Sequence, residues 1–313
     1  MSEMSADARK QNGKRLILYL GINFGITWLF EFLVIWPAVF NPRPLVQSIT
    51  QLLLAVVMFF PALSVLLTRL ITREGFKDAM LAPKTGKRSI PYFLMAWFGP
   101  QLLTTAGAVI YFLVFPRHFD PDMGYLAALL AQQGVEPTNQ LITATVISQL
   151  GAGIFLAPAL NFIPCFGEEW GWRGYLLPKL KKQWRLLPTL LISGLIWGVW
   201  HLPIIMLGHN YGTGYMGYPI TGILAMCVFC VVTGTIFSYL TIRTGSCLPA
   251  VLAHGGLNGF ASAGLLFANI NENISPFVGP VPTGIVGGSA YIICAVVMGL
   301  LLLRKENAAA ERS

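Results

Sequence analysis

Long apolar runs separated by short polar loops set the pattern of this chain from residue 16 to residue 303. An α-helix rises about 1.5 Å per residue, so about 20 apolar residues cross the roughly 30 Å hydrocarbon core of a bilayer. The pattern therefore predicts an all-α fold, a polytopic transmembrane helical bundle of about eight spans. These spans are predicted at 16–38, 45–68, 90–115, 154–180, 187–207, 219–242, 247–268 and 284–303.

The fourth apolar run is too long for one straight span, because it extends from about residue 141 to residue 182. Gly151, Gly153, Pro158 and Pro164 interrupt this run. Proline lacks the backbone N–H that a helix interior needs, and glycine weakens a helix. We therefore expect a shorter helix or a re-entrant piece before the break, and the true span after it.

Polar segments divide the chain into five parts. The longest external loop follows the third span, and the segment with the candidate chemistry follows that loop. The parts are a cytoplasmic tail at 1–14, N-terminal transmembrane spans at 15–115, the external loop at 116–140, a catalytic core at 141–268, and the last span with a cytoplasmic tail at 269–313.

Composition and charge support a membrane protein. Hydrophobic residues make up 55% of the chain and charged residues 11%, against about 25% charged in soluble domains. The net charge of +8 is compatible with a nucleic-acid partner, but the predicted spans place 19 Lys and Arg residues on one face and only Arg43 and Arg117 on the other. The positive-inside rule then predicts an integral, multi-pass membrane protein with both termini in the cytoplasm and no nucleic-acid partner.

Three stretches place polar and ionisable side chains inside the apolar runs. An ionisable group is costly at membrane depth, so such groups are retained mainly for function. Two glutamates and two histidines at similar depth are a workable set for activating a water molecule or holding a metal ion. The stretches are Glu168-Glu169-Trp170-Gly171-Trp172-Arg173, Trp197-Gly198-Val199-Trp200-His201 and His254-Gly255-Gly256-Leu257-Asn258.

Spacing within these stretches assigns provisional roles. Glu169 and Arg173 are four residues apart and share a helix face, so Arg173 is expected to neutralise Glu169. That pairing favours Glu168 as the general base, although adjacency alone does not decide between the two glutamates. Trp197 precedes His201 by one turn and is expected to wall the site or to fix the imidazole. The candidate catalytic residues are Glu168, Glu169, His201, His254 and Asn258, with Arg173 and Trp197 in support.

His254 and Asn258 have two alternative roles. They either complete a metal shell or donate hydrogen bonds to the oxyanion that forms during hydrolysis. The metal alternative uses Glu168, His201 and His254 and predicts a divalent cation, with zinc favoured. The zincin motif HExxH, the serine-hydrolase motif GxSxG and a pair of aspartates within the spans are all missing from the sequence.

Small residues accompany the histidines. Gly194 and Gly198 form a GxxxG motif before His201, and Gly255 and Gly259 form another beside His254. Small residues let helix backbones approach closely, which convergence of side chains from several helices requires. A further acid, Glu31, lies in the first predicted span, where we expect a structural hydrogen bond or a position lining a cavity.

Each feature also has an ordinary explanation when it is considered alone. A Glu-Glu pair before a basic loop is often a solvated helix end, and a lone histidine in a span is often an interhelical hydrogen-bonding group. The joint occurrence of the three stretches at similar predicted depth favours the functional explanation.

The order Glu-Glu-x-x-x-Arg, aromatic-x-x-x-His and His-x-x-x-Asn resembles the CAAX protease and bacteriocin-processing family of intramembrane proteases, also called the CPBP or Abi group. The resemblance covers about residues 140–265, with Trp197 where the family commonly has phenylalanine. It implies a helical fold with a cavity open to the cytoplasm and hydrolysis by a glutamate- and histidine-activated water. It also implies that some members are metalloenzymes, with metal use not settled across the family. Eukaryotic members trim the last three residues from prenylated CAAX proteins, whereas prokaryotic members are linked to bacteriocin maturation and immunity or have unknown substrates.

These observations predict an intramembrane endopeptidase that acts on a peptide or lipidated protein within membrane lipid, and the resemblance predicts a CAAX protease-like metalloendopeptidase of the CPBP type. Trp170, Trp172, Trp197 and Trp200 are expected to offer apolar walls for a lipid tail. Two alternatives stay open: a non-enzymatic membrane scaffold or immunity protein with the same fold, and a proton-coupled transporter, since buried Glu and His also form proton relays. The transporter is disfavoured because the polar groups lie almost wholly in the second half of the chain, without matching halves.

Overall fold

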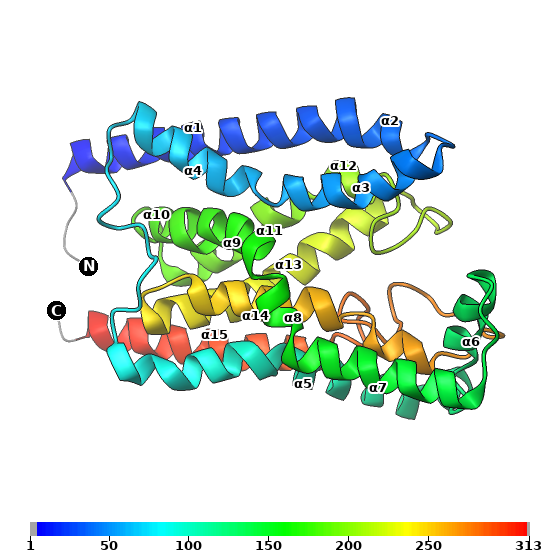
Figure 1. Cartoon of the computed structure of the whole chain (residues 1–313). Coiled ribbons are helices and arrows are strands. Elements are labelled where there is room, and N and C mark those ends of the chain that lie inside the picture. Colours follow the sequence, from blue (N-terminus) through cyan, green and yellow to red (C-terminus); the bar gives the residue numbers. More distant parts are fainter. Residues whose placement is uncertain (1–4, 312–313) are drawn as a thin grey trace. The chain divides into compact units, whose positions relative to one another are not determined.

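The computed structural model describes residues 5–311, apart from the side chains of residues 44, 47, 48, 51, 309 and 310. Every regular element in this range is a helix (Figure 1). The one β-type pairing among these residues is an isolated antiparallel bridge between Phe119 and Ala268. The prediction of an all-α fold is therefore confirmed.

The described residues form two compact units, each assembled from segments that are distant in the sequence. The first unit draws on Met1–Tyr92, Ile163–Val251 and Ala295–Ser313, and the second on Phe93–Phe162 and Leu252–Cys294. Elements wholly or mainly in the first unit are α1 (Ala6–Phe30), the π-helical segment η1 (Glu31–Ile35), α2 (Trp36–Val39), α3 (Pro44–Val57), α4 (Phe60–Ile71), η2 (Gly86–Ser89), α9 (Phe162–Gly171), the π-helical segment η4 (Trp172–Leu176), α10 (Leu177–Lys181), α11 (Leu186–Trp200), α12 (Leu202–Ile205), α13 (Ile220–Thr244) and α15 (Ser289–Ala310).

The second unit is smaller and carries the third motif. Its elements are α5 (Ile90–Val114), η3 (Pro116–His118), α6 (Gly124–Gln132), α7 (Asn139–Phe155), α8 (Ala157–Leu160), most of α14 (Leu248–Phe260) and η5 (Ala263–Phe267).

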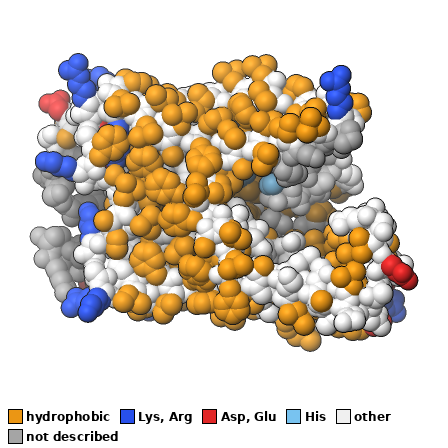
Figure 2. Space-filling model, in the orientation of Figure 1, with side chains coloured by type: hydrophobic (Ala, Val, Ile, Leu, Met, Phe, Trp, Pro, Cys, Tyr) orange, Lys and Arg blue, Asp and Glu red, His pale blue; other side chains and the backbone are white. Residues whose placement is uncertain are grey.

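Five helices of the described chain are long and apolar enough to cross a membrane, which supports the prediction of a polytopic bundle. In the first unit, exposed apolar side chains cover the outer faces of α1, α3 and α4, while the Lys and Arg side chains in view lie toward helix ends (Figure 2). The helices are Ala6–Val39, Leu52–Ile71, Gly86–Val114, Ile220–Thr244 and Leu248–Phe267, and the shorter α11 is also apolar. They match five of the eight predicted spans, whereas the orientation of the termini stays a prediction.

The predicted break in the fourth run is confirmed. A separate helix, α7, ends at Phe155, and the short α8 follows around Pro158. The helix that contains the glutamates then begins at Phe162 and continues through η4 to Lys181. The span predicted at 154–180 is therefore not continuous in its first turns.

The span predicted at 187–207 is also divided. Helix α11 ends at Trp200, His201 has φ −79° and ψ 0°, and α12 begins at Leu202. Pro203 supplies no backbone N–H and would crowd the preceding turn of a continuous helix, which accounts for the interruption. The break places His201 at a helix end rather than within a helix.

Close packing of α11 against α13 confirms the expectation from the first GxxxG motif. A Cβ atom added to Gly194 would lie 2.5 Å from the Cα atom of Val231, and one added to Gly198 would lie 2.5 Å from the Cα atom of Cys227. Only glycine therefore permits this separation of the two helices.

The Gly198→Ala variant is expected to lower the free energy of unfolding by about 1–3 kcal/mol, because the added methyl group must push α11 and α13 apart. Thermal unfolding in detergent measures the effect. Gly25→Ala in α1 is the matched control, since its added Cβ would meet nothing within 4 Å. Equal unfolding temperatures for the two variants would contradict the packing argument.

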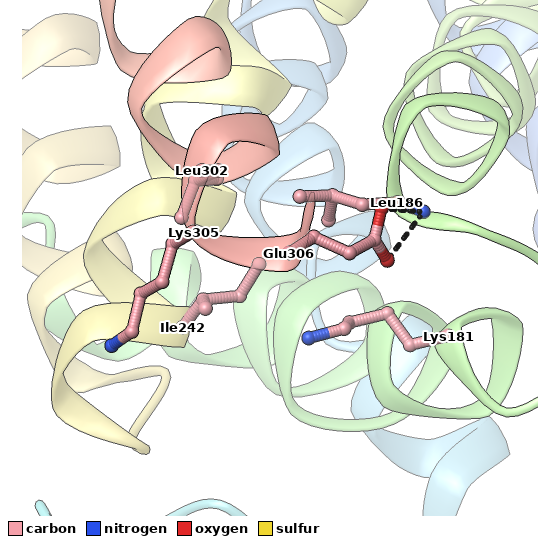
Figure 3. A pocket seen from close by; sticks show the side chains of 6 residues that line it. All are labelled: Lys181, Leu186, Ile242, Leu302, Lys305 and Glu306. Carbon is pink, nitrogen blue, oxygen red and sulfur yellow. Dashed lines mark hydrogen bonds between the residues drawn. The ribbon is translucent and has the colours of Figure 1, made fainter. Parts of the chain in front are cut away.

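The N-terminus of α11 is capped from α15. Both carboxylate oxygens of Glu306 accept a hydrogen bond from the backbone N–H of Leu186, at 3.1 and 3.3 Å (Figure 3). An anion at a helix N-terminus satisfies a free N–H group and complements the helix dipole. Glu306 lies at the edge of a cavity of about 290 Å³ together with Lys181, Leu186, Ile242, Leu302 and Lys305. This cap fixes the start of α11, the helix that His201 directly follows.

Candidate active site

Glu168 is held by two tryptophans. Its side chain is buried on α9, and its Oε2 atom accepts hydrogen bonds from Nε1 of Trp172 at 3.2 Å and from Nε1 of Trp197 at 2.8 Å. Trp172 comes from the next turn of the same helix, whereas Trp197 comes from α11. Two donors from different helices fix the orientation of this carboxylate.

Glu169 forms the ion pair that the sequence predicted. Nη1 of Arg173 donates to Oε1 of Glu169 at 2.9 Å, and the two side chains are 1% and 0% exposed. The guanidinium carbon of Arg173 also lies 4.2 Å from the ring centroid of Trp197 and 5.2 Å from that of Phe237. The buried charges are therefore compensated by each other and by aromatic faces. This arrangement supports Glu168, and not Glu169, as the carboxylate available for chemistry.

A change in helical geometry accompanies these side chains. The helix is α-helical through Glu168 and Glu169 and becomes π-helical at Trp172 and Arg173, in η4. Single π-turns inside α-helices occur frequently at functional sites. Beyond this turn, the helix is anchored to the loop after α4, because Tyr175 donates to Glu74 at 2.9 Å and Lys179 forms an ion pair with Glu74.

His201 is fixed in one tautomer. Its Nδ1 atom lies 2.8 Å from the backbone carbonyl oxygen of Trp197. A carbonyl oxygen only accepts hydrogen bonds, so Nδ1 carries the hydrogen and, in the neutral ring, Nε2 carries the lone pair. The imidazole is 7% exposed, with its centroid 4.9 Å from the ring of Trp200 and 5.9 Å from the ring of Trp197.

Trp197 joins the two candidate groups. Its indole N–H binds Glu168, its carbonyl oxygen binds His201, and its ring lies under Arg173. The sequence predicted that Trp197 walls the site or fixes the imidazole; its backbone carbonyl oxygen contacts Nδ1 of His201, and the role of its side chain stays a prediction. The hydrogen bond from Trp197 to Glu168 was not predicted. Spacing within one helix does not show which side chain of another helix a residue will contact.

The four tryptophans of the first two motifs do not form open walls. Each indole N–H donates within the first unit: Trp170 to the carbonyl oxygen of Ala79, Trp172 and Trp197 to Glu168, and Trp200 to Thr27. All four side chains are buried. The expectation that they line a groove for a lipid tail is therefore wrong for these residues, and their contacts indicate that they brace the site.

His254 and Asn258 lie on α14 in the second unit. His254 is buried and Asn258, one turn later, is exposed. Gly255 and Gly259 beside them pack closely on the α8 region, and Nδ2 of Asn161 donates to the carbonyl oxygen of Gly255 at 3.3 Å. The predicted convergence of His254 and Asn258 with the glutamates stays a prediction, because these two residues belong to the other unit.

Glu31 is the first residue of the other π-helical segment, η1. Its side chain is fully buried, and neither carboxylate oxygen has a hydrogen-bond partner among the side chains that the structure describes. The expected structural hydrogen bond is thus not found in this part of the chain.

The residues predicted to hold a metal ion are divided between the two units. Within residues 5–311, no group of three or more His, Cys, Asp or Glu side chains is arranged to hold a metal. Oε2 of Glu168 already accepts two indole N–H groups, and Glu169 is paired with a cation. The predicted metal set of Glu168, His201 and His254 stays a prediction, because His254 belongs to the other unit, and we derive no reaction step through a metal.

Comparisons with known proteins agree with the motifs. Residues 124–260 match the family model described as type II CAAX prenyl endopeptidase Rce1-like, a range that contains all three motifs. A 44-residue segment is 36% identical to CAAX prenyl protease 2 of Methanococcus maripaludis and covers 14% of this chain and 16% of that relative. These matches confirm the resemblance to CAAX-type proteases that the motifs predicted.

Proposed function

We propose that this protein is an intramembrane endopeptidase that hydrolyses a peptide bond with a water molecule activated by Glu168 and His201. The observation that carries the proposal is the link through Trp197, which binds Glu168 with its indole N–H and His201 with its carbonyl oxygen. A buried carboxylate and an imidazole with a defined lone pair, fixed by one residue, are suited to orient and deprotonate a water.

The proposed reaction begins with a water molecule between Glu168 and His201. The lone pair on Nε2 of His201 accepts one hydrogen bond from the water and orients it, while Glu168 removes the other proton. The water oxygen then bonds to the carbonyl carbon, and the carbonyl oxygen becomes an oxyanion. Glu168 returns its proton to the amide nitrogen as the C–N bond breaks, which gives a carboxylic acid and an amine.

His254 and Asn258 are proposed as the groups that stabilise the oxyanion. Their spacing of four residues places them on one face of α14. Hydrogen-bond donors aimed at a developing negative charge lower the barrier, and loss of one donor typically costs about 2.7–4 kcal/mol. A divalent metal stays a prediction that metal analysis of the purified protein decides.

A peptide with a lipidated C-terminal region is the proposed substrate class. The family-model match and the name of the relative, CAAX prenyl protease 2, support this choice. Apolar helices favour a substrate whose tail partitions into the bilayer, and the predicted cytoplasmic face favours entry from that side.

The full-length protein in proteoliposomes is expected to cleave a prenylated peptide with a C-terminal CAAX sequence at least tenfold faster than the same peptide without the lipid. The physical reason is that the lipid concentrates the peptide at the membrane and aligns it with the site. Cleavage rates of the two peptides, followed by mass spectrometry, measure the difference. Equal rates would remove the lipid from the proposed substrate class, and no cleavage of any lipidated peptide would favour the scaffold alternative.

A further inference from the structure

A column of polar residues runs along the buried face of α1 and into the first residue of η1, outside the residues matched by the family model. Tyr19, Asn23, Thr27 and Glu31 are spaced four residues apart, and each is 0% exposed. Nδ2 of Asn23 donates to the hydroxyl of Tyr19 at 3.3 Å, and Oγ1 of Thr27 donates to Oδ1 of Asn23 at 3.4 Å. Buried polar groups of this kind are retained where their hydrogen bonds specify a local arrangement.

Two contacts join α1 to Trp200, one of them through Thr27 of this column. Nε1 of Trp200 donates to Oγ1 of Thr27 at 3.0 Å, and Nε1 of Trp28 donates to the backbone carbonyl oxygen of Trp200 at 3.2 Å. Helix α1 therefore binds both the side chain and the main chain of Trp200, the last residue of α11.

Trp200 in turn contacts both sides of the candidate site. Its ring meets the His201 ring edge to face at 4.9 Å and the Trp172 ring at 5.6 Å. Trp172 donates to Glu168, and Tyr19 of the column packs edge-on against Trp172 at 6.4 Å. One tryptophan thus connects α1 with the supports of Glu168 and His201.

The location of these contacts gives them a specific task. The last carbonyl groups of a helix have no partner within the helix, so the end of α11 needs support from outside. His201 directly follows, where the chain leaves helical geometry before Pro203. Catalysis is sensitive to displacements of about 1 Å, so the support of this helix end affects the position of the imidazole.

We propose that Thr27 and Trp28 of α1 are positioning residues for the reaction, which hold His201 in place through Trp200. The inference rests on the proposed function, since it assigns a catalytic purpose to the contacts. It extends the active-site support to a helix that the sequence motifs do not include.

The test uses the full-length protein and substitutions that preserve shape. Thr27→Val removes the acceptor of the Trp200 N–H, whereas Thr27→Ser retains a hydroxyl. Thr27→Val is expected to lower kcat about tenfold or more with KM changed less than about twofold, and Thr27→Ser is expected to restore most of the activity. Trp28→Phe, which keeps a ring but loses the N–H, is expected to lower kcat in the same way.

Thr68→Val on α4 is the matched control. Thr68 is also fully buried in the first unit, and its hydroxyl has no hydrogen-bond partner among the described residues. The kcat of Thr68→Val is expected to stay within about twofold of the kcat of the unmodified protein, since the variant loses no contact to the candidate site. If Thr27→Val prevents folding, the comparison of Trp28→Phe with Thr68→Val carries the test.

The outcomes separate the positioning role from the proposed function. Normal kcat in Thr27→Val and Trp28→Phe, with His201→Ala inactive, would overturn the positioning role alone. An equal decrease in kcat for Thr27→Ser and Thr27→Val would also overturn the positioning role of Thr27. Full activity of His201→Ala would instead overturn the proposed function.

Discussion

Glu168→Gln is expected to lower kcat for peptide cleavage by about 10²- to 10⁴-fold, the usual contribution of a general base. Glutamine has nearly the same shape, and its amide oxygen can still accept the N–H groups of Trp172 and Trp197. The substitution also removes an ionisable group from a buried position, so the protein is expected to remain folded. Initial rates at saturating substrate and thermal unfolding in detergent measure the two properties.

Glu136→Gln serves as the control for Glu168→Gln, because Glu136 is exposed in the loop after α6. Its activity is expected to equal that of the unmodified protein. His201→Ala is expected to show a loss comparable to that of Glu168→Gln, since both groups contact the same proposed water. Retained cleavage by Glu168→Gln would assign the base elsewhere, with Glu169 as the first residue to test.

Arg173→Met is expected to cause the largest loss of stability, about 3–5 kcal/mol in the free energy of unfolding. The substitution keeps the length of the side chain but leaves the Glu169 carboxylate buried without its cation. It also removes the contact with the faces of Trp197 and Phe237. Thermal or denaturant unfolding in detergent measures the change.

Two further variants serve as controls for Arg173→Met. Arg43→Met, at an exposed position before α3, is expected to change stability by less than about 0.5 kcal/mol. The double variant Arg173→Met with Glu169→Gln is expected to recover much of the lost stability. Removing both charges of a buried ion pair destabilises a protein less than removing one charge and leaving the other buried without its partner. A double variant as unstable as Arg173→Met would show that the lost contribution is packing and not charge compensation.

The parts of the site that depend on spacing within one helix could be predicted from the sequence. The pair of Glu169 and Arg173 and the contact of Trp197 with His201 both follow from positions one turn apart. The close approach of α11 at Gly194 and Gly198 also follows, since only small residues permit it.

Contacts between helices could not be predicted in this way. The hydrogen bond from Trp197 to Glu168 and the contacts of Thr27 and Trp28 with Trp200 join residues at least 29 positions apart. Hydropathy also treats the segment 187–207 as one span, although Pro203 ends α11 early and leaves His201 at a helix end. The spacing of residues in the sequence shows which side chains share one face of a helix. Tertiary packing decides which neighbouring helix that face contacts.

Mass spectrometry of products formed in H₂¹⁸O tests the central claim most directly. Proteoliposomes with the unmodified protein or with Glu168→Gln are incubated with one prenylated CAAX peptide, and the masses and amounts of the fragments are compared. Hydrolysis by an activated water predicts cleavage by the unmodified protein, one ¹⁸O atom in the new carboxyl group, and at least 100-fold less product with Glu168→Gln. Equal amounts of product from the two proteins would contradict the assignment of Glu168 as the base.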